Sequence, residues 1–343
     1  MPHQGRRVIL VIADKSQEDE AIPLAIGVDL GGTKIRGAVV EATGQVLAEV
    51  RYPTGPGGAE NVIARVKDVV RSLLSDPVLA KRKPLGIGVG APGYVDPRNG
   101  TMRNAANLEV DYLSLGPILE AEFALPVAFA NDANAAVLGE KHFGAGRGVQ
   151  YLAYLSLGTG IGLGLILDGK LYLGARGLAG EIGNMQIGLP HDADRSEMGG
   201  NLESLAAGPA VARKAQLAIG QGEKSLISQM ADRGDITAET VARAARQGDA
   251  LGMSLLREAA SYLGLAIAGL IDLLDLELVI VGGGLSESGE FFLEAIREVV
   301  RRHVLPVYRD VVPIVRAALG EHAGVIGAAS LIFVEGNFGR GKS

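Results

Sequence analysis

The chain of 343 residues contains no cysteine and no tryptophan. Without thiols it forms no disulfide, and cysteine nucleophiles and thiolate metal ligands are excluded. Lysine and arginine number 33 against 39 aspartates and glutamates, which gives a net charge of −6. This balance argues against a nucleic-acid partner, which usually binds through a basic patch. The absence of thiols is compatible with a reducing compartment, and we expect a cytoplasmic protein.

The sequence shows neither a secretory leader nor a clear membrane span. The run VILVIA near the N-terminus is too short for a leader and ends in DKSQEDE. The most apolar long stretch, 263–284, contains Asp272, Asp275 and Glu277, and charges inside a bilayer are costly. We therefore expect a buried helix followed by a strand, and no membrane partner. Residues 1–20 form an N-terminal tail of unclear role.

Glycine, in contrast, is abundant, with 49 residues, about twice the usual share of ~7%. Segment 25–52 reads AIGVDL, GG, TKIRGAVV, EATG, QVLAEVRY, which is typical of three strands joined by two turns. Segment 150–174 repeats the pattern as QYLAYLSL, GTG, IGLGLIL, DG, KLYLG. The dipeptide DG is a strong hairpin signal. Helical sequence follows each meander, so the chain predicts two similar α/β halves.

Each half also contains an apolar strand that stops at glycine, at 84–93 (PLGIGVGAPG) and at 276–284 (LELVIVGGG). Two such halves facing each other would place glycine turns on both sides of a cleft. Backbone N–H groups exposed at glycine turns bind phosphate oxygens well. The predicted fold is therefore α/β and two-lobed, with a phosphate-binding cleft between the lobes.

Two other phosphate-binding folds fit the sequence less well. GTGIG at 158–162 partly matches the dinucleotide-binding fingerprint, but that fingerprint must open a helix. Here the chain continues as ILDGKLYLG, which has strand character and a hairpin turn. A Walker A loop, GxxxxGK[ST], does not occur.

Five motifs in a fixed order carry a resemblance to a known family: DLGGTK (29–34), GVGAPGYVD (88–96), NDANAAVLGE (131–140), LGTGIGLGLILDGKLYLGARGLAGEIG (157–183) and VIVGGG (279–284). Together they resemble the ROK family of sugar kinases, within the actin-like, hexokinase-like ATPases, from about 24 to 335. The resemblance implies a ribonuclease H-like fold with a duplicated three-strand meander and an active site in the interlobe cleft. It implies a small lobe at 21–130, with a C-terminal helix at about 323–343 packing back onto it, and a large lobe at 131–322.

The resemblance assigns ATP to three glycine turns. DLGGTK corresponds to the first phosphate loop, in which Asp29 would hold Mg²⁺ through water, and this would explain an acid inside an apolar strand. GTGIG corresponds to the second phosphate loop, and VIVGGG to the adenosine loop. The expected ATP-binding residues are Asp29, Gly31, Gly32, Thr33, Lys34, Gly158, Thr159, Gly160, Gly282, Gly283 and Gly284.

On the sugar side, the resemblance implies that Asp132 is the general base and accepts the proton of a sugar hydroxyl. Asn131 and Asp132 lie between an apolar strand and a helical pattern, so simple N-capping is an alternative for both. Glu181, Glu203 and Asn107 correspond to sugar contacts of the family, although each also fits a surface position. The expected substrate-binding residues are Asn107, Asn131, Asp132, Glu181, Asn184 and Glu203.

One stretch departs from the family pattern. Most members carry ExGH and then CxCGxxGCxE, whose His and three Cys bind a structural zinc. Here the sequence reads GEIGNM and DRSEMGGNLE, and we align Glu203 with the final Glu. The Cys positions are then Asp194, Ser196 and Asn201, and Asn184 replaces the His. We expect no structural zinc. Because that His also touches the sugar, its loss leaves the substrate less constrained, although Asn184 can still hydrogen-bond a hydroxyl.

The expected function is ATP-dependent phosphorylation of a hexose, with glucose at its 6-hydroxyl as the first candidate, by a homodimer or homotetramer. Another hexose, N-acetylglucosamine or N-acetylmannosamine is an alternative substrate. Some family members are repressors, which need a helix-turn-helix segment before DLGGTK, and the 28 residues that precede Asp29 show no helix pair. A non-catalytic sugar-binding protein is opposed by the presence of Asp29, Asp132, both glycine loops and both glutamates, and a chaperone-type ATPase is disfavoured by the size of the chain and by GEIG.

Overall fold

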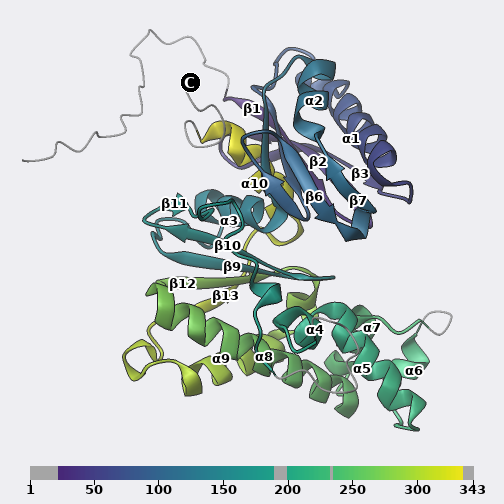
Figure 1. Ribbon diagram of the computed structural model, residues 1–343, viewed down its shortest axis with the longest axis vertical. Coiled ribbons are helices and arrows are strands. Elements are labelled where there is room, and N and C mark those ends of the chain that lie inside the picture. The colour runs from purple at the N-terminus through teal and green to yellow at the C-terminus, as the bar shows by residue number, and fades with distance from the viewer. Residues whose placement is uncertain (1–21, 189–198, 232–234, 335–343) are drawn as a thin grey trace, which may run out of the picture.

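The computed structural model describes residues 22–188, 199–231 and 235–334. It has two lobes that follow one another along the longest axis of the molecule (Figure 1). The described strands form two five-stranded sheets and a smaller three-stranded sheet. The 1–20 tail lies outside the described residues.

The first sheet has the strand order β3-β2-β1-β4-β8. β1, β2 and β3 form an antiparallel meander, and β4 and β8 extend it parallel to β1. Glycine breaks the run between β1 and β2, and the apolar residues on either side are buried. The strands are β1 (Leu24–Leu30), β2 (Lys34–Glu41), β3 (Val46–Pro53), β4 (Ile87–Ala91) and β8 (Val127–Asn131).

The second sheet, with the order β11-β10-β9-β12-β13, repeats this arrangement. β9, β10 and β11 are the antiparallel meander, and β12 and β13 run parallel to β9. The predicted duplication is therefore confirmed. The strands are β9 (Leu152–Leu157), β10 (Ile161–Leu167), β11 (Lys170–Leu171), β12 (Leu278–Gly282) and β13 (Ile314–Arg316).

The first lobe carries an additional antiparallel sheet, β5-β6-β7, inserted between β4 and β8. Helix α1 packs on β2 and β3, and α2 packs on β8. The elements of this part are β5 (Tyr94–Asp96), β6 (Thr101–Ala105), β7 (Val110–Leu113), α1 (Gly58–Leu74), α2 (Leu115–Phe123), η1 (Pro77–Leu79) and η2 (Ala106–Leu108).

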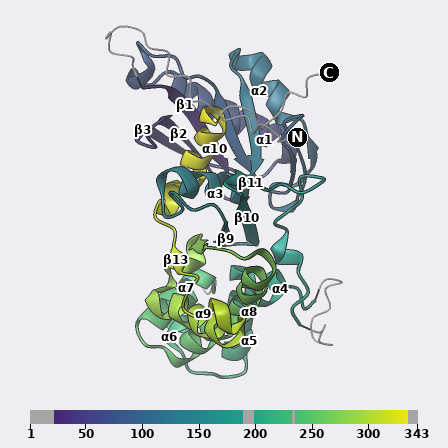
Figure 2. The ribbon, with the colours of Figure 1, turned by 90° about the vertical axis from the view of Figure 1, so that its left-hand side faces the viewer.

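Two helices, α3 (Asp132–Phe143) and α10 (Ala323–Phe333), lie between the two large sheets (Figure 2). α3 contacts β4 and β8 of the first sheet and β9 and β10 of the second. α10 lies so close to β1 and β4 that neither strand has room for a side chain there. A Cβ at Gly27 would be 2.0 Å from the carbonyl oxygen of Val325, and one at Gly88 would be 1.8 Å from another carbonyl oxygen of α10.

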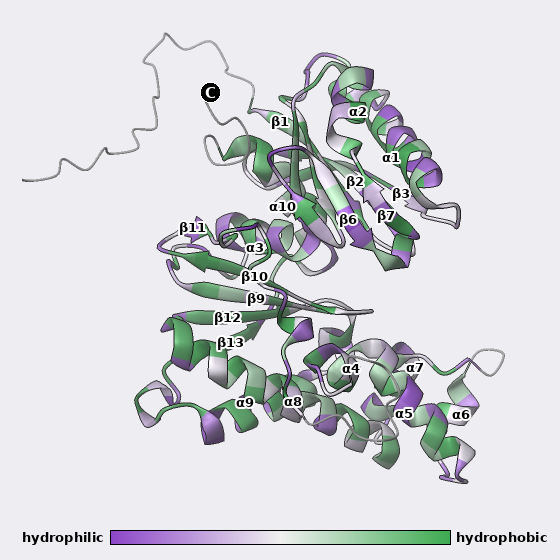
Figure 3. Cartoon of the chain, in the orientation of Figure 1, coloured by the Kyte–Doolittle hydropathy of each residue, from purple (hydrophilic) through white to green (hydrophobic). Residues whose placement is uncertain are grey.

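Most of the remaining described helices cover the outer face of the second sheet (Figure 3). Their hydrophobic residues and those of the sheet form one core. α8 is long and apolar enough to cross a membrane by length and composition, yet 56% of its most apolar window is buried. It packs against α4, α5, α7 and α9 as a core helix and leads into β12, as expected from the sequence. These elements are η3 (Ile182–Asn184), α4 (Leu202–Ala206), α5 (Gly208–Gly220), α6 (Leu226–Met230), α7 (Ala238–Arg246), α8 (Ala250–Leu274), η4 (Gly284–Ser288), α9 (Glu290–His303) and η5 (Pro306–Tyr308). The short helix η6 (Gly320–His322) instead leads into α10 and contacts the first sheet through Glu321.

Candidate active site

A cavity of about 790 Å³ brings together glycine turns from three separate parts of the chain. Thr33 comes from the turn between β1 and β2. Gly158 and Thr159 come from the turn between β9 and β10, and Gly284 follows β12. The apolar residues of its lining are Pro209, Ala212, Ile236, Ala238, Ala242 and Leu285, and the polar side chains of Thr237, Glu239, Arg246 and Glu287 complete it. Polar backbone on one side and an apolar wall on the other suit a ligand with phosphates at one end and an aromatic base at the other.

The glycines of these turns fall into two structural classes. A Cβ at Gly282 would lie 2.3 Å from the Tyr154 hydroxyl, and Gly283 has a φ of +82° with Leu157 backbone 2.4 Å away. These two glycines are required by packing. At Gly158 and Gly284 a Cβ would meet nothing within 4 Å. Because both of these line the cavity, their missing side chains keep its space open.

The turn between β1 and β2 is held from behind by Thr54. The N–H of Gly31 donates to the carbonyl of Lys34 at 3.1 Å. The Thr54 hydroxyl donates to the carbonyl of Gly31 at 2.7 Å, and its N–H donates to the carbonyl of Thr33 at 3.0 Å. The carbonyls are therefore drawn into the protein, while Thr33 and Lys34 remain exposed.

The turn between β9 and β10 is tied to Glu203 of α4. The Ile161 N–H donates to Glu203 Oε2 at 2.9 Å, and a Cβ at Gly160 would lie 2.6 Å from the same oxygen. The other neighbour of Glu203 is Gly183, where a Cβ would be 3.1 Å from Oε2. Gly183 belongs to the GEIG segment, so one carboxylate contacts both a predicted phosphate loop and the predicted sugar site.

Asp29 is the only residue of β1 that is not fully buried, and its carboxylate sits at the N-terminal end of α10. A Cβ at Gly324 would be 2.6 Å from Asp29 Oδ2. Burial raises the pKa of Asp29, and the positive charges of Arg36 and Lys34 oppose that rise. Arg36 is itself bound to the carboxylate and the carbonyl of Glu321, just before α10.

Asn131 and Asp132 lie where β8 ends and α3 begins. Asn131 Oδ1 accepts from the Ala133 N–H at 3.0 Å, and its Nδ2 donates to the carbonyl of Gly93 at 3.1 Å. Asn131 is therefore the N-cap of α3, which was the alternative considered for it. Burial, followed by the charge of Asp29, raises the pKa of Asp132 to about 6. A carboxylate with this pKa is suited to accept a proton near neutral pH.

Glu181, in the segment that enters η3, faces Asn131 across a small cavity of about 50 Å³. Burial raises the pKa of Glu181, and the nearby charge of Glu203 adds to the effect. Asn184 Nδ2 lies 3.5 Å from Glu181 Oε2. The structure thus brings together four residues that lie far apart in the sequence, Asn131, Glu181, Asn184 and Glu203. Their amides and carboxylates are groups that hydrogen-bond sugar hydroxyls.

Asn107 lies elsewhere, against the first turn. A Cβ at Gly32 would be 2.9 Å from Asn107 Nδ2, and both residues line a cavity of about 420 Å³ together with Thr33. Thr33 also lines the large cavity. Asn107 is therefore next to the predicted nucleotide loop and does not share the small cavity of Asn131 and Glu181.

A family model described as the ROK family matches residues 25–334 of the chain. The chain belongs to the ROK family.

Its ROK relatives include enzymes and regulators. It is 34% identical to the glucokinase of Halalkalibacterium halodurans over 313 residues, which cover 90% of this chain and 94% of that protein. It is 31% identical to the xylose repressor of Caldicellulosiruptor bescii over 330 residues, which cover 96% of this chain and 81% of that protein. Among solved structures, the ROK family glucokinase from Streptomyces griseus in complex with glucose and AMPPNP superposes with a TM-score of 0.80. The identity is 34%, and the match covers 90% of this chain and 98% of that chain.

The structure adds residues to which the sequence assigned no role. Asn134, on α3, is only 4% exposed and lines the small cavity, yet its Oδ1 has no hydrogen-bond partner in the part of the chain that is described. The apolar wall of the large cavity was also missed. All of its residues except Leu285 lie in the 203–274 region, which reads as one long helical stretch, and nothing in their spacing signals a shared cavity. Asn134 belongs to the NDAN motif, so there was more reason in the sequence to consider it than to consider the residues of the apolar wall.

The zinc positions of other ROK proteins are only partly described. Asp194 and Ser196 lie outside the described residues. Asn201 caps α4, because its Oδ1 accepts from the Ser204 N–H at 2.8 Å. Among the described residues no group of three or more His, Asp or Glu side chains is arranged to hold a metal. The absence of structural zinc stays a prediction.

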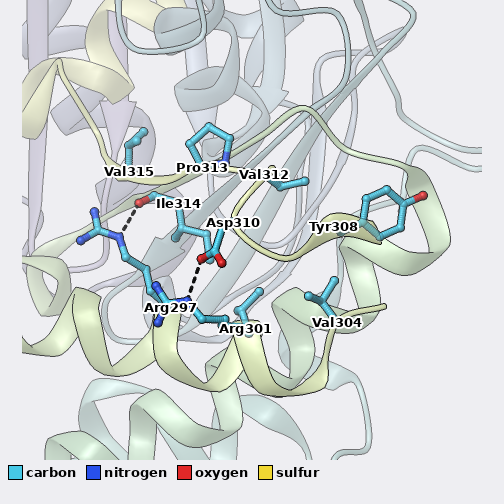
Figure 4. Close-up of a pocket in the computed structure, with 10 residues that line it drawn as sticks. Arg297, Arg301, Val304, Tyr308, Asp310, Val312, Pro313, Ile314 and Val315 are labelled. Carbon is cyan, nitrogen blue, oxygen red and sulfur yellow. Dashed lines mark hydrogen bonds and ion pairs between the residues drawn. The ribbon is translucent and has the colours of Figure 1, made fainter. Parts of the chain in front are cut away.

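A further cavity of about 280 Å³ lies on the outside of the second lobe, between α9 and the segment around β13 (Figure 4). Arg297 Nε donates to the carbonyl of Ile314 at 2.9 Å, and Arg301 Nε donates to Asp310 at 2.8 Å. Its charged groups are already paired, and it contains none of the residues predicted for the ROK active site.

Proposed function

We propose that this protein is an ATP-dependent hexose kinase that transfers the γ-phosphate of ATP to the 6-hydroxyl of glucose. The observation that best supports this is the large cavity, where three glycine turns meet an apolar wall. Glu203 accepts a hydrogen bond from the second turn and lies near Glu181, so it connects the large cavity with the residues proposed to bind the sugar. The glucokinase relatives and the glucose and AMPPNP complex of the Streptomyces griseus enzyme support the same substrates.

ATP fits the large cavity in one orientation. The purine lies against Ile236, Ala238 and Leu285, where burial of its apolar faces is favourable. The phosphates then reach the backbone of Gly158 and Thr159, with the Thr33 turn on the opposite side. Little covalent chemistry is needed from the protein in phosphoryl transfer, so placing the phosphates and the acceptor hydroxyl in line is its main task.

The carboxylates near the phosphates fit a magnesium site. Mg²⁺ is commonly held by one or two carboxylates, several waters and the substrate phosphates, and Asp29 offers such a carboxylate at the edge of the cleft. Its negative charge is close enough to raise the pKa of Asp132, so the two acids together favour a cation. When bound, the ion neutralises charge on the transferring phosphate.

Asp132 is the proposed general base. Its carboxylate accepts the proton of the sugar 6-hydroxyl as that oxygen attacks the γ-phosphorus, and ADP leaves with the electrons of the broken bond. Because Asn131 is locked by its bonds to Ala133 and Gly93, the start of α3 holds Asp132 in a fixed position. Glu181, Asn184 and Glu203 orient the other sugar hydroxyls, whereas Asn107 lies beside the Gly32 turn, so any sugar contact from it requires the first lobe to move.

A coupled assay of ADP release tests this function. We expect kcat/KM to be higher for glucose than for mannose, fructose, allose, N-acetylglucosamine or N-acetylmannosamine. Turnover with another of these sugars in preference to glucose would correct the substrate. Sugar binding without ADP release from any of them would instead indicate a sugar-binding regulator, as the repressor relatives are named.

We further propose lobe boundaries of 21–130 and 131–322, with α10 packing back onto the first lobe. In support, the first sheet ends with β8 at Asn131, and α10 contacts β1, β2, β4 and β8. We also propose that the protein acts in the cytoplasm, where ATP is available, as a homodimer or homotetramer.

A further inference from the structure

A cavity of about 660 Å³ lies between the β5-β6-β7 sheet and the segment 174–181 that follows β11. It is distinct from the nucleotide cavity and adjoins the sugar side, because Val95 lines both it and the small cavity of Asn131 and Glu181. We refer to it as the sheet cavity.

One wall of the sheet cavity is a row of three side chains across the small sheet. Tyr94 pairs with Arg103 in β5 and β6, and Arg103 pairs with Tyr112 in β6 and β7, so all three occupy one face. The guanidinium carbon of Arg103 lies 5.2 Å from the centroid of the Tyr112 ring. Tyr94 and Tyr112 are 38% and 54% exposed.

The backbone turns a neighbouring side chain toward the same cavity. Asn104 has a φ of +51°, in the left-handed region that Asn tolerates better than most residues. Adjacent residues of a regular strand point to opposite faces. Here Arg103 and Asn104 both line the sheet cavity. Such local strain is often found at ligand sites.

The opposite wall is the segment 174–181, which separates the sheet cavity from the sugar side. Arg176 and Leu178 line the sheet cavity, whereas Gly177, Ala179, Gly180 and Glu181 line the small cavity. Gly177 has a φ of +76°, which lets the segment bend around β5. A ligand held by Arg176 would therefore contact the segment that carries Glu181.

The charges of the sheet cavity favour an anion. Arg103 and Arg176 line it from the small sheet and from segment 174–181, and neither guanidinium forms an ion pair or hydrogen bond with any described residue. The acid in the lining, Asp96, already accepts from the Arg98 N–H at 3.0 Å and from Asn99 Nδ2 at 2.8 Å. Two unpaired guanidinium groups on a chain of net charge −6 form a focused positive site, and guanidinium groups are well matched to phosphate.

From this geometry we propose that the sheet cavity is a second ligand site, which binds a phosphorylated hexose. Arg103 and Arg176 hold the phosphate from the two lobes. The exposed rings of Tyr94 and Tyr112 cover the apolar face of the sugar, and Asn104 and Ser114 are free to bond its hydroxyls. The site rests on the proposed kinase function only in that such a compound is the product of that reaction.

Direct binding of glucose 6-phosphate tests the site. Calorimetry is performed with glucose and a non-hydrolysable ATP analogue at saturation, so that the catalytic site is occupied. We expect one remaining glucose 6-phosphate site per chain. Arg103→Gln and Arg176→Gln should each weaken it about tenfold or more, because each removes a charge-assisted bond. Tyr112→Ala should weaken it about fivefold and Tyr112→Phe less than twofold, since the ring is kept in the latter.

Arg98→Gln is the matched control, because Arg98 lies in the turn between β5 and β6, is exposed and does not line the cavity. Its affinity for glucose 6-phosphate should equal that of the wild type. The absence of a second binding event, or equal affinity in both arginine variants and the wild type, would refute the site. Inorganic phosphate that binds as tightly as glucose 6-phosphate would refute the sugar contacts. None of these measurements requires turnover, so they remain informative if the kinase assay fails.

Discussion

The two large sheets share one strand order but carry different chemistry. In the first, the turn after β1 is closed by the pair Leu30–Ile35; in the second, the turn after β9 is closed by Leu157–Ile161. Two residues before Gly31 stands Asp29, and two residues before Gly158 stands Ser156. The same backbone frame thus ends in a carboxylate on one side of the cleft and in a hydroxyl on the other.

The difference separates the strands that the two sheets share from the segments that occur only once. In the proposed site both sheets supply backbone turns for phosphates, but Asp29 and Asp132 are attached to the first sheet. The carboxylates of the sugar side, Glu181 and Glu203, are attached to the insertion after β11. In the proposed site the repeated part is therefore the frame, and the proposed base and sugar contacts come from parts that are not repeated.

The largest expected effect comes from Asp132, which has no counterpart in the second half. Asp132→Asn removes the base and keeps the size of the side chain, so kcat should fall by about 10²–10⁴-fold. Sugar affinity, measured by calorimetry, should stay within about threefold. A kcat near that of the wild type would show that another group accepts the proton.

Asp29→Ser makes the first half resemble the second at this position. We expect kcat to fall by about 10²-fold or more, because the charge that orients the metal and the phosphates is lost. Ser156→Ala is the matched control in the second half, and it should change kcat less than about threefold. Equal losses in the two variants would mean that the two turns contribute in the same way.

The glycines offer a smaller and more local test. Gly158→Val and Gly284→Val place side chains in open space of the large cavity, so ATP affinity should fall by about tenfold or more while the melting temperature stays close to that of the wild type. Gly283→Val should instead lower the melting temperature, since its φ is +82° and backbone lies 2.4 Å away. Unchanged nucleotide affinity in both cavity variants would refute the assignment of the cavity to ATP.

The acid environment of the first half also predicts a pH dependence. With its pKa at about 6, Asp132 is protonated below that pH and unable to act as a base. We expect kcat/KM to fall about tenfold for each pH unit below 6 and to level off above it. A profile that stays flat between pH 5 and 7 would contradict the role of this carboxylate.

The smallest expected effect concerns stability. The pKa of Asp132 rises from 3.8 when unfolded to about 6 in the folded protein. Between these values the folded state binds more protons, so stability decreases as the pH rises through this window. Asp132→Asn should therefore raise the melting temperature by a few degrees at pH 7.5 and less at pH 4. A melting temperature below that of the wild type at pH 7.5 would show that the charge does not oppose folding.

Much of the frame could be read from the sequence, because alternation and glycine turns are local signals. The two meanders, the strand after α8 and the glycine turns of DLGGTK, GTGIG and VIVGGG are all found where they were expected. It was harder to predict which distant segments would meet at one cavity. The apolar wall of the nucleotide cavity comes from α5, α7 and η4, which become neighbours only through tertiary packing. Asn134 could not be singled out, because an unpartnered amide is a property of its surroundings.

Individual roles within the predicted site also depend on geometry that no motif shows. The sequence left Asn131 as a sugar ligand or a helix cap, and in the structure both ends of its amide are already bonded. Glu203 was expected at the sugar, and its carboxylate also accepts the N–H that follows the second glycine turn. These assignments depend on which hydrogen bonds are satisfied inside the protein, which is fixed only when distant segments meet.

The position of α10 has a consequence for how the chain is made. Strands β1 and β4 are synthesised early, and the helix that covers them is translated only after the second lobe. Until residues 323–333 leave the ribosome, Gly27 and Gly88 lack the helix that packs on them, although α3 already contacts β4, so the first lobe cannot complete its folding in the order in which it is translated. The second lobe, in contrast, can form its core first. A nascent chain that stalls shortly before α10 would thus expose part of β1 and β4 that the complete chain covers.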